Sequence, residues 1–437
     1  MPVLNQSPMV SRFSLKSGFA RNVLTLFTGS TIAQAIPVLV SPILTRLYLV
    51  EDFAALTVIT TLISLVGVIV AGRYEVAVGL PEDNREARQL VYLAIFIAFM
   101  VSGVTFLALL VFHDIIAETL NMTAAPGYLF LVPFAALFYG LIQALTYWHI
   151  RQRKYNILAA SRINQSLVNS GLSLGFAFTG WGINGLIIGN VSGHLSAMLH
   201  LLRSSLKDKV FDFRKSDREP ADLKILAAKY SDLPKVNGVH AFTDMAQSSF
   251  VIFLISGYFG AVATGLYGLT IRILQAPLNV IGSSVAIVFY KEVAEKINRR
   301  QKITKLLRTT ITTLALISLP LFIIIFIWGP ELFGWVFGND WREAGNYARI
   351  LCPWLYLNFI ASPLSHLPVI LNKQRQYFLF SLIGNGAVII SLSLGAYLYA
   401  DISSSLVLIA VTQALFQFSM ICYFIHIARN AEKSSLP

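Results

Sequence analysis

Long apolar stretches alternate with short polar connections along this chain, and the basic residues gather in every second connection. Hydrophobic residues make up 56% of the 437 residues and charged residues only 13%, about half the charge of an ordinary soluble domain. Runs such as 90–112 and 311–328 approach the roughly 20 residues that a helix needs to cross a bilayer. The chain is therefore expected to fold as helices that satisfy their own backbone hydrogen bonds in lipid.

Twelve such stretches can be separated. The predicted spans are 21–47, 53–72, 88–112, 128–150, 156–179, 182–203, 230–256, 262–290, 309–328, 346–371, 376–399 and 402–428. Prolines interrupt the first, seventh, eighth and tenth spans, either as static kinks or as points that bend during a working cycle.

Most of the 34 Lys and Arg residues lie in the N-terminal segment, in the connections near 73–90, 151–162, 203–229, 291–308 and 373–375, and near the C-terminus. The connections between these hold only Arg46, Arg342 and Arg349, while Lys235 and Arg272 fall inside spans. This alternation is typical of a multi-pass membrane protein with both termini in the cytoplasm. The net charge of +12 therefore requires no nucleic-acid partner.

The longest basic connection, 203–229, divides the spans into two sets of six with the same orientation. Such sets can form a parallel repeat about an axis along the membrane normal. We predict an all-α polytopic membrane protein of twelve transmembrane helices in two six-helix lobes related by a pseudo-two-fold axis. The predicted lobes are 1–206 and 223–437, joined by a cytoplasmic linker, 207–222.

Motifs for chemistry are missing from the sequence. It has no G-x-x-x-x-G-K-[ST] phosphate loop, and its seven histidines do not cluster with cysteines and carboxylates at metal-binding spacing. The basic loop 203–229 has no Asp-x-Asp pair to hold a metal–diphosphate donor. We expect no catalytic residue, metal or cofactor, and hence neither a membrane glycosyltransferase nor an ATP-driven pump.

Charged groups at bilayer depth cost about 2.5–3.5 kcal/mol each to insert and usually face a cavity or a partner. Arg272 is expected roughly 16 Å from the outer surface, from a rise of 1.5 Å per residue. It either pairs with Asp244 to neutralise both charges, or meets an anionic substrate in a polar cavity. These two arrangements can alternate between conformational states of the protein. The predicted substrate-binding residues are Lys235, Asn237, His240, Asp244, Gln247 and Arg272.

Other polar residues within the spans either line the same cavity or form interhelical hydrogen bonds; they are Gln34, Gln143, Tyr147, Asn164, Gln165, Asn169, Asn358, His366, Asn385, Gln413 and Gln417. At the basic end of the second span, Arg73, Tyr74 and Glu75 are either interface anchors or an inner gate. Anchoring is the preferred interpretation, although Glu75 precedes a further apolar run, 76–80, and so fits an inner gate or a substrate-entry contact better than an anchor.

Three segments carry a resemblance to a known family: RYEVAVGLP at 73–81, GLYGLTIRILQAPL at 265–278, and IGSS at 281–284 with VFY at 288–290. With these segments and the twelve-span plan, the chain resembles the Wzx-type oligosaccharide-lipid flippases. These belong to the multidrug/oligosaccharidyl-lipid/polysaccharide exporter superfamily. The resemblance covers about residues 18–428, and its motifs are family patterns rather than catalytic signatures.

The resemblance implies two lobes around a central cavity in the bacterial inner membrane. It implies that an undecaprenyl-diphosphate-linked sugar unit crosses from the cytoplasmic to the periplasmic leaflet by alternating access, for O-antigen, exopolysaccharide or capsule synthesis. The lipid tail would pass through a gap between the lobes. The implied partners are this lipid-linked oligosaccharide, inner-membrane lipids, and a polysaccharide polymerase with its chain-length regulator.

Two alternatives stay open at this point. A cation-coupled drug exporter of the same superfamily would favour carboxylates in its cavity. A membrane polysaccharide polymerase or ligase would usually present a large outer loop with catalytic Arg or His, which this sequence lacks.

The charge pattern yields a topology that can be tested. Reporter fusions that are active only outside the cytoplasm should be active in 113–127 and 329–345, and inactive in 203–229. A cytoplasmic location of either of the first two segments would refute the arrangement.

Overall fold

The structure is a computed structural model that describes residues 17–122, 126–208, 210, 220–299, 301–371 and 373–435. Part of the predicted linker 207–222 and the basic residues Arg12, Lys16, Lys209, Arg214, Lys215, Arg218 and Arg300 lie outside the described residues. The long helices are α1 (Ser17–Leu47), α2 (Val50–Gly67), α3 (Asn84–Thr119), α4 (Leu131–Arg151), α5 (Tyr155–Phe178), α6 (Ile183–Lys207), α8 (Val239–Asn298), α9 (Thr304–Phe337), α10 (Arg342–Ala361), α12 (Gln374–Tyr399) and α13 (Ile402–Ser435). The short ones are η1 (Tyr74–Gly79), η2 (Pro126–Phe130), α7 (Pro220–Lys229), η4 (Leu233–Gly238), η5 (Asn339–Trp341), η6 (Ser362–His366) and α11 (Leu367–Ile370).

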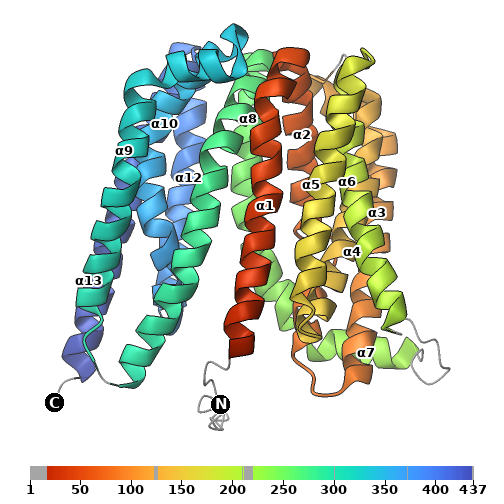
Figure 1. Ribbon diagram of the computed structural model, residues 1–437, viewed down its shortest axis with the longest axis vertical. Coiled ribbons are helices and arrows are strands. Elements are labelled where there is room, and N and C mark those ends of the chain that lie inside the picture. The colour runs from red at the N-terminus through yellow and green to blue at the C-terminus, as the bar shows by residue number, and fades with distance from the viewer. Residues whose placement is uncertain are drawn as a thin grey trace.

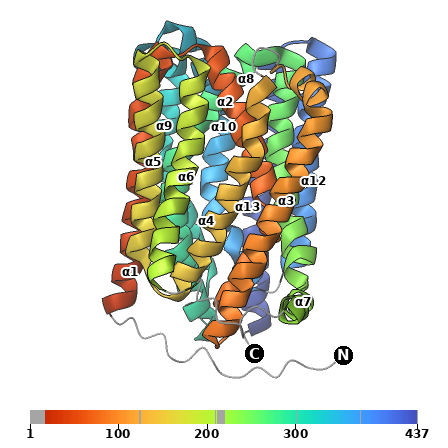
Figure 2. The ribbon, with the colours of Figure 1, turned by 90° about the vertical axis from the view of Figure 1, so that its right-hand side faces the viewer.

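Nine helical segments within the described residues are long and apolar enough to cross a membrane. One of them, 233–297, is interrupted at Gly260, whose φ of 81° ends one helical stretch of α8 and starts the next. Helices α5 and α10 run beside the apolar helices, but more polar residues lower their hydropathy (Figures 1 and 2). The prediction of an all-α, multi-pass membrane protein is confirmed, and the count of twelve spans stays a prediction.

The long helices form two bundles that stand side by side (Figure 1). The first bundle contains α1 to α6, and the second contains α8 to α13. Both described ends of the chain lie at the same end of the molecule, together with the basic connections after α4 and α8 (Figure 1). We call this the basic end. The two-lobe architecture is confirmed, while the exact residue boundaries of the lobes stay predictions.

At the end opposite the basic end, the bundles are joined through Arg46 at the end of α1. Its guanidinium donates to the backbone carbonyls of Val336, at 2.7 Å, and Trp335, at 2.9 Å, in the last turn of α9. The indole of Trp341 donates to the Thr45 carbonyl at 2.9 Å, and this indole is 1% exposed. One of the few basic residues away from the basic end therefore closes the opposite end.

A second polar link lies between α3 and α8. The Ser256 hydroxyl donates to the Leu120 carbonyl at 2.6 Å, and the Asn121 amide donates to the Ser256 carbonyl. Toward the basic end, by contrast, α1 and the last part of α8 diverge (Figure 1).

Helix α2 of the first bundle crosses α8 of the second at backbone contact distance. A Cβ on Gly265 would lie 2.2 Å from the Val50 carbonyl oxygen, and one on Gly268 would lie 2.2 Å from Thr57 Oγ1. Real Cβ atoms cannot occupy such positions, so only glycine permits this approach. Small residues allow two membrane helices to meet closely.

We predict that Gly265→Ala separates α2 from α8 and destabilises the protein by about 1–3 kcal/mol, the usual cost of overpacking. Gly103→Ala in α3 is the matched control, because nothing lies within 4 Å of the position of its Cβ. Thermal unfolding in detergent should show a lower midpoint for Gly265→Ala alone. Equal midpoints for the two variants would contradict the crossing.

Candidate functional site

A polar cavity of about 430 Å³ lies between α2 and α8, beside the glycine crossing. We call it the seam cavity. Its α2 wall is a stripe of hydroxyl residues, Thr57, Thr60, Thr61 and Ser64. Their hydroxyls donate to carbonyls one turn earlier in α2, so they are satisfied without a partner helix. The α8 wall includes Gln247, Arg272 and Gln275, and α10 adds Trp354.

Arg272 is the cation of the seam cavity. It follows Gly268 by one helical turn, which places it next to the close crossing. Within the part of the chain that the structure describes, its guanidinium has no hydrogen bond or ion pair. Two neighbours in the lining, Trp354 and Ser249, each bury a polar atom that also lacks a hydrogen-bond partner. The cavity therefore offers several unused hydrogen-bond donors around one positive charge.

A second polar cavity, of about 510 Å³, lies between α1, α5 and α6 of the first bundle and α8 of the second. We call it the amide cavity, because Gln34, Gln165, Asn169 and Asn190 line it. The side-chain oxygen of Asn190 is buried without a partner. Arg272 also lines this cavity, so a single guanidinium borders both polar cavities.

Arg162 supplies a second cation to the amide cavity, where it donates a hydrogen bond to Ser30. The charge pattern places Arg162 in a basic connection, so its position in this cavity was not predicted. Its spacing from Gln165 and Asn169 could have revealed it, since residues i, i+3 and i+7 share one helix face. Those two amides were correctly grouped with the polar residues able to line a cavity.

An apolar groove of about 620 Å³ adjoins the amide cavity. Its walls come from α1, α8 and α9, including Leu278, Ile325 and Phe333. The groove shares Gln34 and Ala276 with the amide cavity. A continuous series therefore runs from an apolar groove, through an amide-lined cavity, to Arg272 and the seam cavity. No Asp or Glu is among the described residues that line the three.

Two of the six predicted substrate-binding residues, Gln247 and Arg272, line these cavities. Lys235, Asn237, His240 and Asp244 do not. The expected polar stripe is therefore split: Gln247 lines the seam cavity, whereas His240 and Asp244 contact α12.

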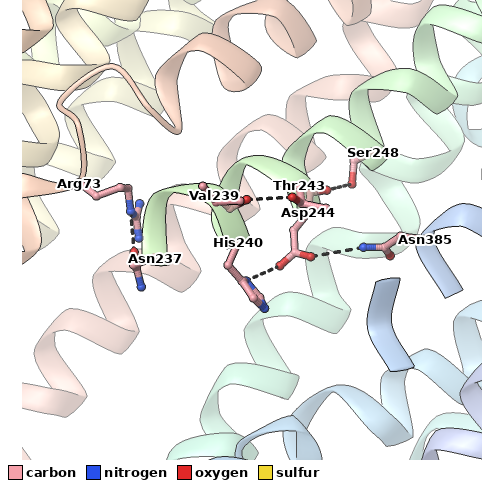
Figure 3. Close-up of polar contacts among 8 residues, drawn as sticks. All are labelled: Arg73, Asn237, Val239, His240, Thr243, Asp244, Ser248 and Asn385. Carbon is pink, nitrogen blue, oxygen red and sulfur yellow. Dashed lines mark hydrogen bonds and ion pairs between the residues drawn. The ribbon is translucent and has the colours of Figure 1, made fainter. Parts of the chain in front are cut away.

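Asp244 is not paired with Arg272 in this arrangement, and the expected pairing stays a prediction. Asp244 instead lies 3.3 Å from the His240 ring nitrogen and accepts a hydrogen bond from Asn385 of α12 at 3.4 Å (Figure 3). Asp244 therefore ties the start of α8 to the second bundle, and Arg272 is left without a carboxylate.

The predicted inner-gate residues lie together at the basic end. Arg73 donates to the Asn237 side chain at 2.9 Å (Figure 3), and Tyr74 donates to the Ala227 carbonyl at 3.1 Å. Glu75 is only 2% exposed and lies 3.6 Å from Arg73. Burial raises the pKa of the Glu75 carboxyl, and the hydrogen bond from its own backbone N–H and the Arg73 charge offset this rise only in part.

These features define a multi-pass α-helical membrane protein with two bundles around a cation-bearing interior. The family model described as "Polysaccharide biosynthesis protein" matches residues 43–346. The chain therefore belongs to the polysaccharide biosynthesis protein family. No curated protein sequence matches it significantly.

Solved structures share the fold at low sequence identity. The lipid II flippase MurJ, in an inward closed conformation, has a TM-score of 0.69 at 14% identity, over 94% of this chain and 90% of that one. An inward-facing multidrug resistance MATE family transporter of the MOP superfamily has a TM-score of 0.68 at 13% identity, over 94% and 96%. An outward-facing transporter of that family reaches 0.60 at 13%, over 95% and 96%.

We predict that inorganic diphosphate stabilises the purified protein through Arg272. Hydrogen bonds to charged groups contribute about 1.5–3 kcal/mol, so Arg272→Ala should weaken binding by roughly 10- to 100-fold. Arg272→Lys should retain part of the effect, because an ammonium cannot form two parallel bonds to one phosphate. Thermal shift against diphosphate concentration measures this.

Lys235→Ala, which removes an exposed cation outside the cavities, is the control. Asp244→Asn should leave both protein yield and diphosphate binding unchanged, since Asp244 does not hold Arg272. An unchanged diphosphate response of Arg272→Ala would remove Arg272 from the site.

Proposed function

We propose that this protein flips undecaprenyl-diphosphate-linked oligosaccharide units from the cytoplasmic to the periplasmic leaflet of the bacterial inner membrane. The basic end faces the cytoplasm, in agreement with the distribution of Lys and Arg. The product would serve O-antigen, exopolysaccharide or capsule synthesis. A polysaccharide polymerase and its chain-length regulator are the proposed downstream partners.

The observation that carries this proposal is the composition of the three neighbouring cavities. A lipid-linked sugar has an apolar tail, a doubly charged diphosphate and a hydroxyl-rich head. The apolar groove between α1, α8 and α9 suits the tail, and Arg272 suits the diphosphate. The amide cavity and the hydroxyl stripe of α2 suit the sugar, because amides and hydroxyls both donate and accept hydrogen bonds.

The contacts between the bundles support alternating access. Three of them lie at the end opposite the basic end, at Arg46, Trp341 and Ser256, whereas α1 and the last part of α8 diverge toward the basic end (Figure 1). The fold is also more similar to the inward-facing MATE transporter than to the outward-facing one. We propose that residues 1–206 rock against residues 223–437, which opens one end as the other closes.

The lining of the cavities disfavours the alternatives. A cavity for cationic drugs needs carboxylates to balance the drug charge, whereas Arg162 and Arg272 are the charged residues in the described lining. A polymerase or ligase needs groups positioned to break a glycosyl–phosphate bond. The hydroxyls on the α2 wall of the seam cavity are already bonded within α2. We therefore propose translocation with no chemistry on the substrate.

Removal of the protein tests the proposal. We expect cells that lack it to synthesise the lipid-linked unit and to retain it in the cytoplasmic leaflet. Leaflet location can be measured by the access of a periplasmic glycosidase or of an impermeant lectin to intact spheroplasts. Wild-type protein should restore access, and Arg272→Ala at the same membrane level should not.

Absence of the lipid-linked unit in the deletion strain would indicate a biosynthetic enzyme instead. If the Arg272→Ala variant also restored access to the lipid-linked unit, the flipping proposal would stand, but Arg272 would be excluded as the diphosphate-binding residue.

A further inference from the structure

One tryptophan in the wall of the seam cavity has no structural partner for its polar atom. Trp354 lies in α10, and its half-buried indole ring lines the cavity together with Arg272. Its Nε1 atom is buried and has no hydrogen-bond partner within the described residues. An indole N–H can only donate, and a buried donor without an acceptor opposes folding. The fold therefore gains little from the polar edge of this ring.

The usual structural roles of a buried tryptophan do not account for Trp354. In the part of the chain that the structure describes, no cation–π contact or ring pairing involves it. Trp341, by contrast, donates its N–H to the Thr45 carbonyl and packs edge-on against Phe53, with 4.9 Å between the ring centroids. Trp148 also buries an unpaired N–H, but its ring lies in an apolar cluster. Among the described tryptophans, Trp354 is the one that lines a polar cavity.

Polar groups of both bundles share the seam cavity with this ring. Gln247 and Gln275 of α8 have no hydrogen bond within the described residues, so both amides are free to donate and to accept. The α2 hydroxyls already donate within their own helix and therefore have oxygen lone pairs left to accept. Ser249 adds a buried hydroxyl without a partner. The cavity thus combines a flat aromatic ring with hydrogen-bonding groups on its other walls.

This combination suits a sugar ring better than a lipid tail or a diphosphate. A pyranose has a face of C–H groups, which packs on an aromatic ring, and an edge of hydroxyls, which needs donors and acceptors. The cavity volume of about 430 Å³ lies within the range of about 300–1,000 Å³ for small-molecule sites. A lipid tail would leave the amides unpaired, and a diphosphate would gain nothing from the ring.

The neighbouring groove indicates which sugar reaches Trp354. Among the described lining residues, the apolar groove and the seam cavity have none in common. Ala276, one turn after Arg272 in α8, lines the groove, whereas Arg272 itself lines the seam cavity. In a lipid-linked unit the diphosphate separates the tail from the first sugar. With the tail in the groove and the diphosphate at Arg272, the first sugar therefore lies in the seam cavity.

We propose that Trp354 is the stacking surface for the sugar joined to the diphosphate, and that the seam cavity selects this first sugar. The indole ring packs on the C–H face, while Gln247, Gln275 and the α2 hydroxyls bond the hydroxyl edge. Because α10 belongs to the second bundle and α2 to the first, the bound sugar contacts both bundles. This inference rests on the proposed transport function, since it takes a lipid-linked sugar as the ligand.

The test observes Trp354 directly in the purified protein. The six tryptophans are replaced by 5-fluorotryptophan, and the fluorine signal that is lost in Trp354→Phe is assigned to Trp354. The probes are farnesyl diphosphate and its derivatives that carry glucose, galactose, N-acetylglucosamine or N-acetylgalactosamine on the diphosphate. We expect a sugar-bearing probe to shift the Trp354 signal and to bind more tightly than farnesyl diphosphate, which should leave the signal in place.

Variants separate the contribution of the ring from that of the charge, with affinities measured by calorimetry. Trp354→Leu removes the flat ring and its N–H, so it should cancel the gain in affinity from the sugar, roughly 3- to 10-fold, about the worth of one hydrogen bond. Trp354→Phe keeps a flat ring and should lose only part of this gain. Arg272→Ala should weaken every probe to a similar degree. Trp148→Phe, the matched control, removes another buried and unpaired indole N–H and should leave the sugar response unchanged.

A Trp354 signal that no sugar-bearing probe shifts would overturn the proposal. An equal shift with farnesyl diphosphate alone would overturn it too, because the tail or the diphosphate would then contact the ring. If Trp354→Leu does not fold, Trp354→Phe and the signal of the wild-type protein decide. If farnesyl diphosphate does not bind, methyl glycosides of the same sugars test the ring alone, and a Trp354 signal that none of them shifts excludes the site.

The two proposals can fail separately. A Trp354 signal that responds to sugars, in a protein that leaves lipid-linked sugars in the cytoplasmic leaflet, would reject the transport proposal alone. Normal transfer to the periplasmic leaflet without any response of Trp354 to sugars would reject the stacking surface alone.

Discussion

The close crossing of α2 and α8 is the contact on which the interior of this protein depends. Gly265 and Gly268 bring the two backbones together, and a helix cannot separate from such a contact without losing dispersion energy along its whole length. The next turn of α8 carries Arg272, which is too large for the crossing and so occupies the space where the helices part. The glycines thus determine both where the bundles touch and where a cavity can form.

The polar interior explains why the helices differ in hydropathy. Helices that face lipid on most sides, such as α3 and α9, are strongly apolar. Helix α5 instead carries Arg162, Gln165 and Asn169 on a face that lines a cavity, which lowers its hydropathy although it lies within the same bundle. A guanidinium held there without a carboxylate keeps its full charge for a ligand, at the expense of some stability.

Much of this architecture could be predicted from the sequence because lipid restricts the backbone so strongly. The apolar runs predicted the helices. The placement of Lys and Arg predicted the two bundles and the location of both termini at the same end of the molecule. Arg272 was identified because a charge inside a span is rare. Partners were harder to predict: Asp244 has the right sequence distance for Arg272, but it contacts His240 and Asn385 instead, and α8 is interrupted between Asp244 and Arg272 at Gly260. Arg162 was not predicted to line a cavity, because it lies near a basic loop and was grouped with that loop rather than with the polar face of α5.

The closure at the end opposite the basic end has a property of its own. Arg46 binds Trp335 and Val336 only through their backbone carbonyls, at the C-terminus of α9 where the helix leaves carbonyls unpaired. Every residue type presents the same carbonyl, and the negative end of the helix dipole attracts the guanidinium whatever side chains surround it. The surface around this closure is therefore free to vary in sequence, provided that the arginine, the Trp341 indole and the position at which α9 ends are retained.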